Sequence, residues 1–148
     1  MWQLDLREGI DFSIFLLGSF EPRTGRAFRA IVPPGGTVID IGANMGAHTL
    51  PLAGCVGPTG RVIAVEPTNY AFERLQRQMA LNPALAARIT PVRAMLMGSR
   101  NAALADLVES SWPLAVSKGT HSGHGGLAKA TTGAAVTTLD AVVADLAA

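Results

Sequence analysis

The clearest pattern along the chain is an alternation of short apolar runs with stretches in which apolar residues recur at helical spacing. The apolar runs at 38–41 and 62–65 are rich in β-branched residues, and each is short enough to form one buried strand. After the second run, Phe72, Leu75 and Met79 recur every three or four positions with charged residues between them. Strands that alternate with helices in this way predict an α/β fold with a parallel sheet.

The first fourteen residues follow a shorter period. Apolar and polar residues alternate over 2–6 and again over 10–14, on either side of Glu8 and Gly9. A period of two on both sides of a glycine predicts an N-terminal β-hairpin. Such a hairpin would cover the core or lie over the entrance of a site.

Further elements are predicted by the same criteria. Pro51 lies just after the start of the helix that follows the first strand, so this helix is expected to begin late or to be short. The remaining elements are a short helix at 24–31, a third strand at 89–97, a short helix at 101–108, a mobile loop or hairpin at 110–133, a strand at 134–138 and a closing helix at 141–146.

A glycine turn joins the first strand to the next helix, in the sequence Gly42-Ala43-Asn44-Met45-Gly46. A glycine has no Cβ, so Gly42 and Gly46 leave room for a ligand against the backbone. The first turn of the following helix adds unpaired N–H groups. Strand, glycine turn and helix together predict the first half of a nucleotide-binding βαβ unit. A tight structural bend is the alternative for the turn taken alone.

Two acids flank this turn in the predicted sheet. Asp40 lies at the end of the first strand, where its charge would repel a pyrophosphate and hold a cationic group. Glu66 ends the second strand, about twenty residues after the turn, which is the spacing at which an acid binds the two hydroxyls of a ribose. Together they predict S-adenosylmethionine, a cationic nucleoside without phosphate. As alternatives, Asp40 could be a solvated cap and Glu66 a charge at a strand end.

These residues resemble a known family. The segment 38–49, with its Asp-Ile-Gly-Ala-Asn-Met-Gly core, and the segment 62–67 are similar to the FkbM-type methyltransferases. Phe20-Glu21-Pro22 and Thr138-Leu139-Asp140 add to the resemblance, which runs from about Gly18 to the C-terminus.

The resemblance implies a Rossmann-like class I methyltransferase sheet and methyl transfer to an oxygen or similar nucleophile of a small-molecule or glycan acceptor. It also implies that Glu21 lies near the cofactor. No general base is identified, and His48 is expected to pack or cap rather than to react. The expected cofactor-binding residues are Glu21, Asp40, Gly42, Ala43, Asn44, Gly46, Glu66 and Pro67.

Composition and charge indicate the number of domains, the partners and the compartment. The chain has 148 residues, enough for a single domain, and its formal net charge is +1. This charge gives no bulk attraction to nucleic acid or membrane, so neither is expected as a partner, although a local basic patch is compatible with it. One cysteine, Cys55, and the absence of a signal-peptide pattern predict a cytoplasmic protein. No metal site is expected, since His121 and His124 have no further cysteine or histidine nearby.

The resembled fold has a further strand beside the first one, and no segment after Asp140 can supply it. The sheet is therefore expected to be incomplete at the C-terminus, in a single, apparently truncated domain over 1–148. An open apolar edge on the first strand would favour a homo-oligomer or a complementing second chain.

Two other functions compete with methyl transfer. A nicotinamide-dependent oxidoreductase would favour a G-x-G-x-x-G turn and no acid at the position of Asp40. A cofactor-binding remnant or a structural module without turnover is the alternative outside the enzymes.

Overall fold

The structure is a computed structural model, and it describes residues 1–115, 118–121, 123 and 125–145. Helices and strands alternate through the middle of the chain, as the apolar pattern predicts. In chain order the elements are α1 (Gly9–Leu17), α2 (Pro22–Ile31), β1 (Thr37–Ile41), α3 (Thr49–Cys55), β2 (Arg61–Val65), α4 (Asn69–Ala80), α5 (Pro83–Ala86), β3 (Ile89–Val92), β4 (Ala94–Leu96), β5 (Leu107–Ser111), β6 (Leu127–Ala130), β7 (Ala135–Thr137) and α6 (Leu139–Ala144).

The centre of the fold is a parallel three-stranded sheet in the order β1-β2-β3. Its register places Asp40 of β1 opposite Ala64 of β2, and Ile63 of β2 opposite Thr90 of β3. This confirms the predicted α/β fold with a Rossmann-like parallel sheet. Within the described residues β1 pairs with β2 alone, so its outer edge is open, as predicted from the sequence.

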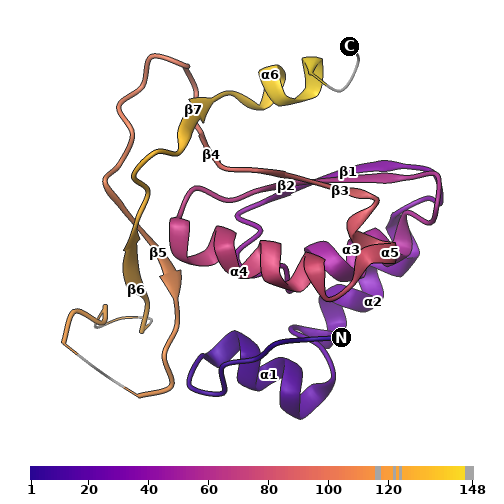
Figure 1. Ribbon diagram of the computed structural model, residues 1–148, viewed down its shortest axis with the longest axis horizontal. Coiled ribbons are helices and arrows are strands. Elements are labelled where there is room, and N and C mark those ends of the chain that lie inside the picture. Colours follow the sequence, from indigo (N-terminus) through magenta and orange to yellow (C-terminus); the bar gives the residue numbers. More distant parts are fainter. Residues whose placement is uncertain (116–117, 122, 124, 146–148) are drawn as a thin grey trace.

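The two faces of the sheet are covered unequally. Alternate residues of a strand point to opposite faces, and Val62 and Ala64 pack with helix residues such as Leu75 in one buried cluster. Ile63 and Val65 point to the other face, where Val142 of α6 packs with them. In Figure 1, α3, α4 and α5 lie on one side of the sheet and α6 on the other.

Helix α3 starts at Thr49, which places Pro51 in its first turn, where a missing N–H is tolerated. The helix is short, as predicted. Thr68 caps α4 and Thr138 caps α6, each through a side-chain oxygen that accepts from a backbone N–H three residues later.

The predicted N-terminal β-hairpin is wrong. Residues 9–17 form α1, in which Ile10 and Ile14 share a face because they are four residues apart. Only the segment before the helix pairs as a strand would: the Gly9 N–H donates to the Trp112 carbonyl at 2.7 Å, and the Leu114 N–H donates to the Arg7 carbonyl at 2.8 Å. The residues before α1 therefore pair with the segment after β5 and do not form a hairpin with residues 10–14.

Two other predictions need correction, and a third is confirmed in one of its two alternatives. The strand expected at 89–97 is broken at Arg93, because β3 continues the central sheet whereas β4 pairs in parallel with β7. The helix expected at 101–108 does not form, and β5 begins at Leu107. The region 110–133 contains an antiparallel β5-β6 pair, the hairpin alternative of the prediction. His124 lies outside the described residues.

Candidate functional site

The glycine turn lies at the carboxyl end of β1 and has three residues with positive φ: Gly42 (77°), Asn44 (49°) and Gly46 (94°). A Cβ on Gly46 would come within 2.9 Å of Leu75 in α4, so this glycine allows close packing. A Cβ on Gly42 would meet nothing within 4 Å. The two glycines therefore differ in role: Gly46 fits the turn to the core, and Gly42 keeps an open space beside it.

The backbone N–H groups of the turn are all engaged within the protein. Gly42 and Ala43 both donate to the Val65 carbonyl, at 2.9 and 3.0 Å, and Gly46 donates to the Ala43 carbonyl at 2.9 Å. Asn44 donates to Glu66 Oε2 at 3.0 Å, and Met45 donates to Asn44 Oδ1 at 2.7 Å. A phosphate needs free N–H groups in such a turn, so this turn does not suit a dinucleotide.

A cavity of about 380 Å³ lies beside the turn. Its volume is in the range of small-molecule pockets, and most of its wall is apolar or aromatic. The turn supplies one wall, the start of α1 a second, and aromatic side chains the rest. The lining residues are Gly9, Ile10, Phe20, Gly42, Ala43, Asn44, Ala47, His48 and Trp112.

Glu66 lies behind the turn and does not line the cavity. Its side chain is buried, with 3% of the residue exposed. Besides the Asn44 N–H, its carboxylate accepts from the Thr68 N–H at 2.9 Å and from Thr68 Oγ1 at 2.6 Å. In this arrangement Glu66 fixes the turn to the start of α4. Pro67 follows it in the connection and does not line the cavity either.

Asp40 is half-buried under the turn, on the strand that leads into it. Thr49 Oγ1 donates to Asp40 Oδ2 at 2.6 Å. Burial raises the pKa of the Asp40 carboxyl, against the opposing effects of Thr49 and His48. Within the described part of the chain, no lysine or arginine forms an ion pair with it.

Glu21 does not line the cavity, but it contacts His48, which does. Its backbone is left-handed, with φ of 46°. Its carboxylate accepts from Thr24 Oγ1 at 3.1 Å and lies 3.4 Å from Nε2 of His48. His48 lines the cavity between the rings of Phe20 and Phe28, each 5.3 Å from it between centroids. Glu21 thus reaches the cavity only through His48.

The structure therefore brings together part of the predicted set. Gly42, Ala43 and Asn44 line the cavity, whereas Asp40, Gly46, Glu66, Pro67 and Glu21 do not; Glu21 contacts His48, which does. Trp112 and Ile10 were not expected to line it. A large aromatic residue in a loop, such as Trp112, could have been suspected of lining a site. Its position beside the turn could not be predicted, because it lies far from residues 42–46 in the sequence.

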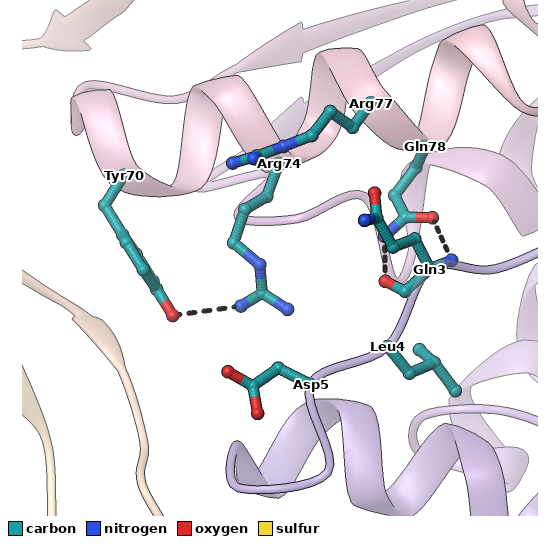
Figure 2. Close-up of a pocket in the computed structure, with 7 residues that line it drawn as sticks. All are labelled: Gln3, Leu4, Asp5, Tyr70, Arg74, Arg77 and Gln78. Carbon is teal, nitrogen blue, oxygen red and sulfur yellow. Dashed lines mark hydrogen bonds between the residues drawn. The ribbon is translucent and has the colours of Figure 1, made fainter.

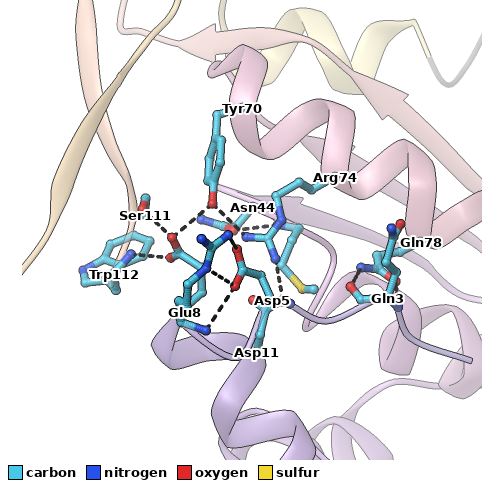
Figure 3. Close-up of polar contacts among 12 residues, drawn as sticks. Gln3, Asp5, Glu8, Asp11, Asn44, Tyr70, Arg74, Gln78, Ser111 and Trp112 are labelled. Atoms are coloured by element: carbon cyan, nitrogen blue, oxygen red, sulfur yellow. Dashed lines mark hydrogen bonds and ion pairs between the residues drawn. The ribbon is translucent and has the colours of Figure 1, made fainter. Parts of the chain in front are cut away.

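A network of hydrogen bonds around Glu8 holds Trp112 in place (Figure 3). The Glu8 carboxylate accepts from the Trp112 N–H at 2.9 Å, from Ser111 Oγ at 2.8 Å and from the Tyr70 hydroxyl at 3.1 Å. On the other side of Tyr70, Arg74 forms a buried ion pair with Asp11 of α1. These contacts link the start of α1 and the residues after β5 to α4, and Gly9, Ile10 and Trp112 line one side of the cavity.

A second hollow, of about 260 Å³, lies between the N-terminal segment and α4. Figure 2 shows its polar side chains, several of which bond to one another. The Gln3 N–H donates to Gln78 Oε1 at 3.0 Å, and Gln78 Nε2 donates to the Gln3 carbonyl at 2.7 Å. These groups join the N-terminus to α4.

Over the residues that the structure describes, no group of three or more histidine, cysteine, aspartate or glutamate side chains could hold a metal ion. None of the described helices is long and apolar enough to cross a membrane.

No protein-family model and no curated protein sequence matches the chain. Several solved methyltransferase structures are similar to it. A SAM-dependent O-methyltransferase from Thermotoga maritima is 22% identical, with a TM-score of 0.48, over 62% of this chain and 37% of that one. A SAM-dependent methyltransferase from Aquifex aeolicus is 22% identical, with a TM-score of 0.44, over 62% of this chain and 44% of that one.

A third structure, P. horikoshii TYW2 in complex with MeSAdo, is 26% identical, with a TM-score of 0.41, over 47% of this chain and 25% of that one. The matched part of each of these three proteins is less than half of its length. These similarities are too low to assign an activity, so the function of the site has to follow from its own geometry.

Proposed function

We propose that the cavity beside Gly42 binds S-adenosylmethionine and that the chain supplies the cofactor-binding part of a methyltransferase. The observation that carries this proposal is a glycine turn that opens a mostly apolar cavity while all its own N–H groups are already bonded. Such a turn favours a nucleoside without phosphate over a dinucleotide. This also argues against a nicotinamide-dependent oxidoreductase.

The residues present fit this cofactor. Gly42, Ala43 and Asn44 allow close approach of a ligand to the backbone, and Phe20 and Trp112 offer aromatic surface to an adenine or a sulfonium. Asp40 lies under the turn and does not line the cavity, but its half-buried carboxyl has no lysine or arginine partner among the described residues, and an ammonium or sulfonium that reached it from the cavity would supply a cation. When bound, the cofactor supplies an activated methyl group.

A contact between Glu66 and the ribose of the cofactor would require Glu66 to change its hydrogen-bond partners. Both of its carboxylate oxygens already accept hydrogen bonds from the protein. To bind a ribose diol directly, it would have to release the Asn44 N–H or Thr68. Its support of the turn contributes to binding in either case.

We further propose, from the resemblance to the FkbM-type enzymes, that the acceptor is an oxygen of a small molecule or glycan. The open edge of β1 is proposed to pair with a strand of a second copy or of a complementing chain, because unpaired N–H and C=O groups at a sheet edge favour strand addition. Ile41 at the end of β1 is 58% exposed and would be covered by such a partner.

Isothermal titration calorimetry with S-adenosylmethionine, S-adenosylhomocysteine and NAD tests the ligand. We expect both adenosyl ligands to bind and NAD not to bind, and Gly42→Val to remove binding because its side chain would occupy the open space. Binding of NAD alone, or of none of the three, would contradict the proposal.

Binding without turnover is the second candidate, since His48 is the only titratable side chain among the described residues that line the cavity. Transfer of a labelled methyl group to an acceptor extract distinguishes the two. Label incorporated by the wild-type chain and lost in Gly42→Val indicates an enzyme.

A further inference from the structure

Helix α1 is inverted relative to an ordinary surface helix. Its acid, Asp11, is completely buried and paired with Arg74, whereas Phe15, Leu16 and Leu17 are 63%, 65% and 57% exposed. Phe12 is also exposed, and positions 12, 15 and 16 share one side of the helix by their spacing. The outward side of α1 is therefore apolar, and Figure 1 shows the helix at the border of the molecule.

A row of arginines follows on the next helix. Arg23, Arg26 and Arg29 of α2 are exposed and recur every three residues, which keeps them along one side. None of them has an ion-pair partner within the described residues. The only exposed acid between Phe12 and Ile31 is Glu21, whose carboxylate already contacts Thr24 and His48.

The apolar helix and the arginine row are close together. Gly18, the residue that ends α1, lines the same hollow as Arg26 and Arg29. Arg23 and Arg26 line the neighbouring hollow. Exposed phenylalanine and leucine beside unpaired arginines form the combination that binds the interface of an anionic bilayer.

We propose that α1 and the arginine row of α2 form a surface that docks on anionic membranes, with Phe12, Phe15, Leu16 and Leu17 entering the headgroup region. The net charge of +1 does not oppose this, because the positive charge is local. A second copy fits the surface less well, since a two-fold contact would bring the arginine row of one copy close to the arginine row of the other. This proposal does not depend on the cofactor.

Docking would also orient the cavity. Gly9 and Ile10 of α1 line the candidate cofactor pocket, and Phe20 and His48 line both that pocket and the hollow of the arginines. A membrane bound to α1 and α2 would therefore lie near the cavity, and an acceptor in the bilayer interface would be close to it.

Co-sedimentation of the full chain with vesicles tests the proposal. The vesicles contain either phosphatidylcholine alone or an equal mixture of phosphatidylcholine and phosphatidylglycerol. We expect binding to the mixed vesicles, weaker binding to the neutral ones, and a loss of binding as salt rises, because salt screens the arginines. A circular dichroism spectrum of each variant checks that it is folded.

Two double variants separate the apolar and the charged contributions to vesicle binding. The double variant Phe15→Gln/Leu16→Gln is expected to abolish binding. The Arg26→Gln/Arg29→Gln pair is expected to weaken binding to the mixed vesicles by about thirtyfold, the product of two arginine contributions, and to leave binding to neutral vesicles unchanged. Leu107→Gln, at an exposed leucine of β5, and Arg61→Gln, at an exposed arginine of β2, are the matched controls.

Absence of vesicle binding by the wild-type chain, or binding that neither variant pair weakens, would overturn the proposal. Analytical ultracentrifugation identifies the competing occupant. A dimer that Phe15→Gln/Leu16→Gln dissociates, without vesicle binding by the wild type, would assign the surface to a second copy and also overturn it. The salt dependence of the wild-type chain is measured in any case, so the test does not rely on the variants folding.

Discussion

Helices α1 and α4 are linked by an ion pair and have opposite patterns of buried and exposed residues. In α4, Leu75 and Ala71 are buried while Glu73 and Arg77 are exposed, as in an ordinary amphipathic helix. In α1 the acid Asp11 is buried and Phe15 is exposed. The ion pair between Asp11 and Arg74 joins the two helices, so the partner of the buried charge comes from the ordinary helix.

This contrast shows what fixes the orientation of each helix. Burial of apolar area is enough to orient α4. For α1, Ile14 contributes apolar burial on the inner side, and the buried carboxylate of Asp11 is compensated by the Arg74 guanidinium and by the Asp5 N–H, which donates to it at 2.8 Å. Changes to the Asp11–Arg74 ion pair should therefore have larger effects on stability than changes on the outer side of α1.

The largest expected effect is that of Arg74→Met. It would leave Asp11 buried without its cation and lower the free energy of unfolding by about 3–5 kcal/mol. Arg77→Met, on the same helix but half-exposed, is the control and should change it by about 0.5 kcal/mol or less. The double variant Asp11→Leu/Arg74→Met should recover most of the loss, since no charge is then buried alone. Urea denaturation measures all three, and equal losses for Arg74→Met and Arg77→Met would contradict the account.

The next largest expected effect is at an apolar residue of α4, Leu75, and its counterpart on α1 is Phe15. Leu75→Ala should lower the free energy of unfolding by about 2–5 kcal/mol, because Leu75 is fully buried against the core and beside Gly46. Phe15→Ala should change it by about 0.5 kcal/mol or less, since this side chain is mostly exposed. Thermal unfolding of both variants measures the difference. A large loss for Phe15→Ala would show that the outer side of α1 is covered.

The same contrast explains how far the sequence could predict the structure. The sheet, α4 and the glycine turn were predicted because each rests on a local apolar period or on backbone chemistry within a few residues. Helix α1 was missed because the partner of Asp11 lies 63 residues away, and Trp112 was missed because Glu8, which holds it, lies 104 residues away. No local period encodes such pairs.

The candidate site was likewise predicted only in its contiguous part. Gly42, Ala43 and Asn44 are contiguous, and they line the cavity as expected. Glu66 was expected at the ligand from its spacing alone, but the spacing cannot show that Thr68 and Asn44 occupy its oxygens. The break between β3 and β4 also has a distant cause, since β4 pairs with β7.

Glu66 is a buried acid held by neutral donors, in contrast to Asp11, which is held by a cation. Glu66→Gln keeps the shape but turns one acceptor into a donor that faces another N–H or O–H. The free energy of unfolding should fall by about 1–3 kcal/mol, and affinity for S-adenosylmethionine should fall about tenfold, which is about 1.4 kcal/mol. Glu73→Gln on the exposed side of α4 is the control. Unchanged affinity in Glu66→Gln, measured by calorimetry, would remove Glu66 from the proposed site.

The smallest expected effect on stability is that of Asp40→Asn, and its sign is opposite. Burial raises the pKa of Asp40 in the folded state above its unfolded value, so its ionisation opposes folding. The stability contributed by the protonated group is present below the unfolded pKa and is lost as pH rises through the folded pKa. Asp40→Asn should therefore be slightly more stable than the wild type at neutral pH, and the difference should disappear as the pH is lowered.

The same substitution should weaken binding of S-adenosylmethionine, because the carboxylate that would face its cationic groups is gone. A gain in stability together with a loss of affinity is expected where a buried charge serves a ligand. Unfolding curves and calorimetry of Asp40→Asn between acidic and neutral pH measure both quantities. Should affinity stay unchanged while stability rises, Asp40 would be a buried acid bonded to Thr49 with no part in binding, and the cationic selectivity proposed for the cavity would have to come from its aromatic walls.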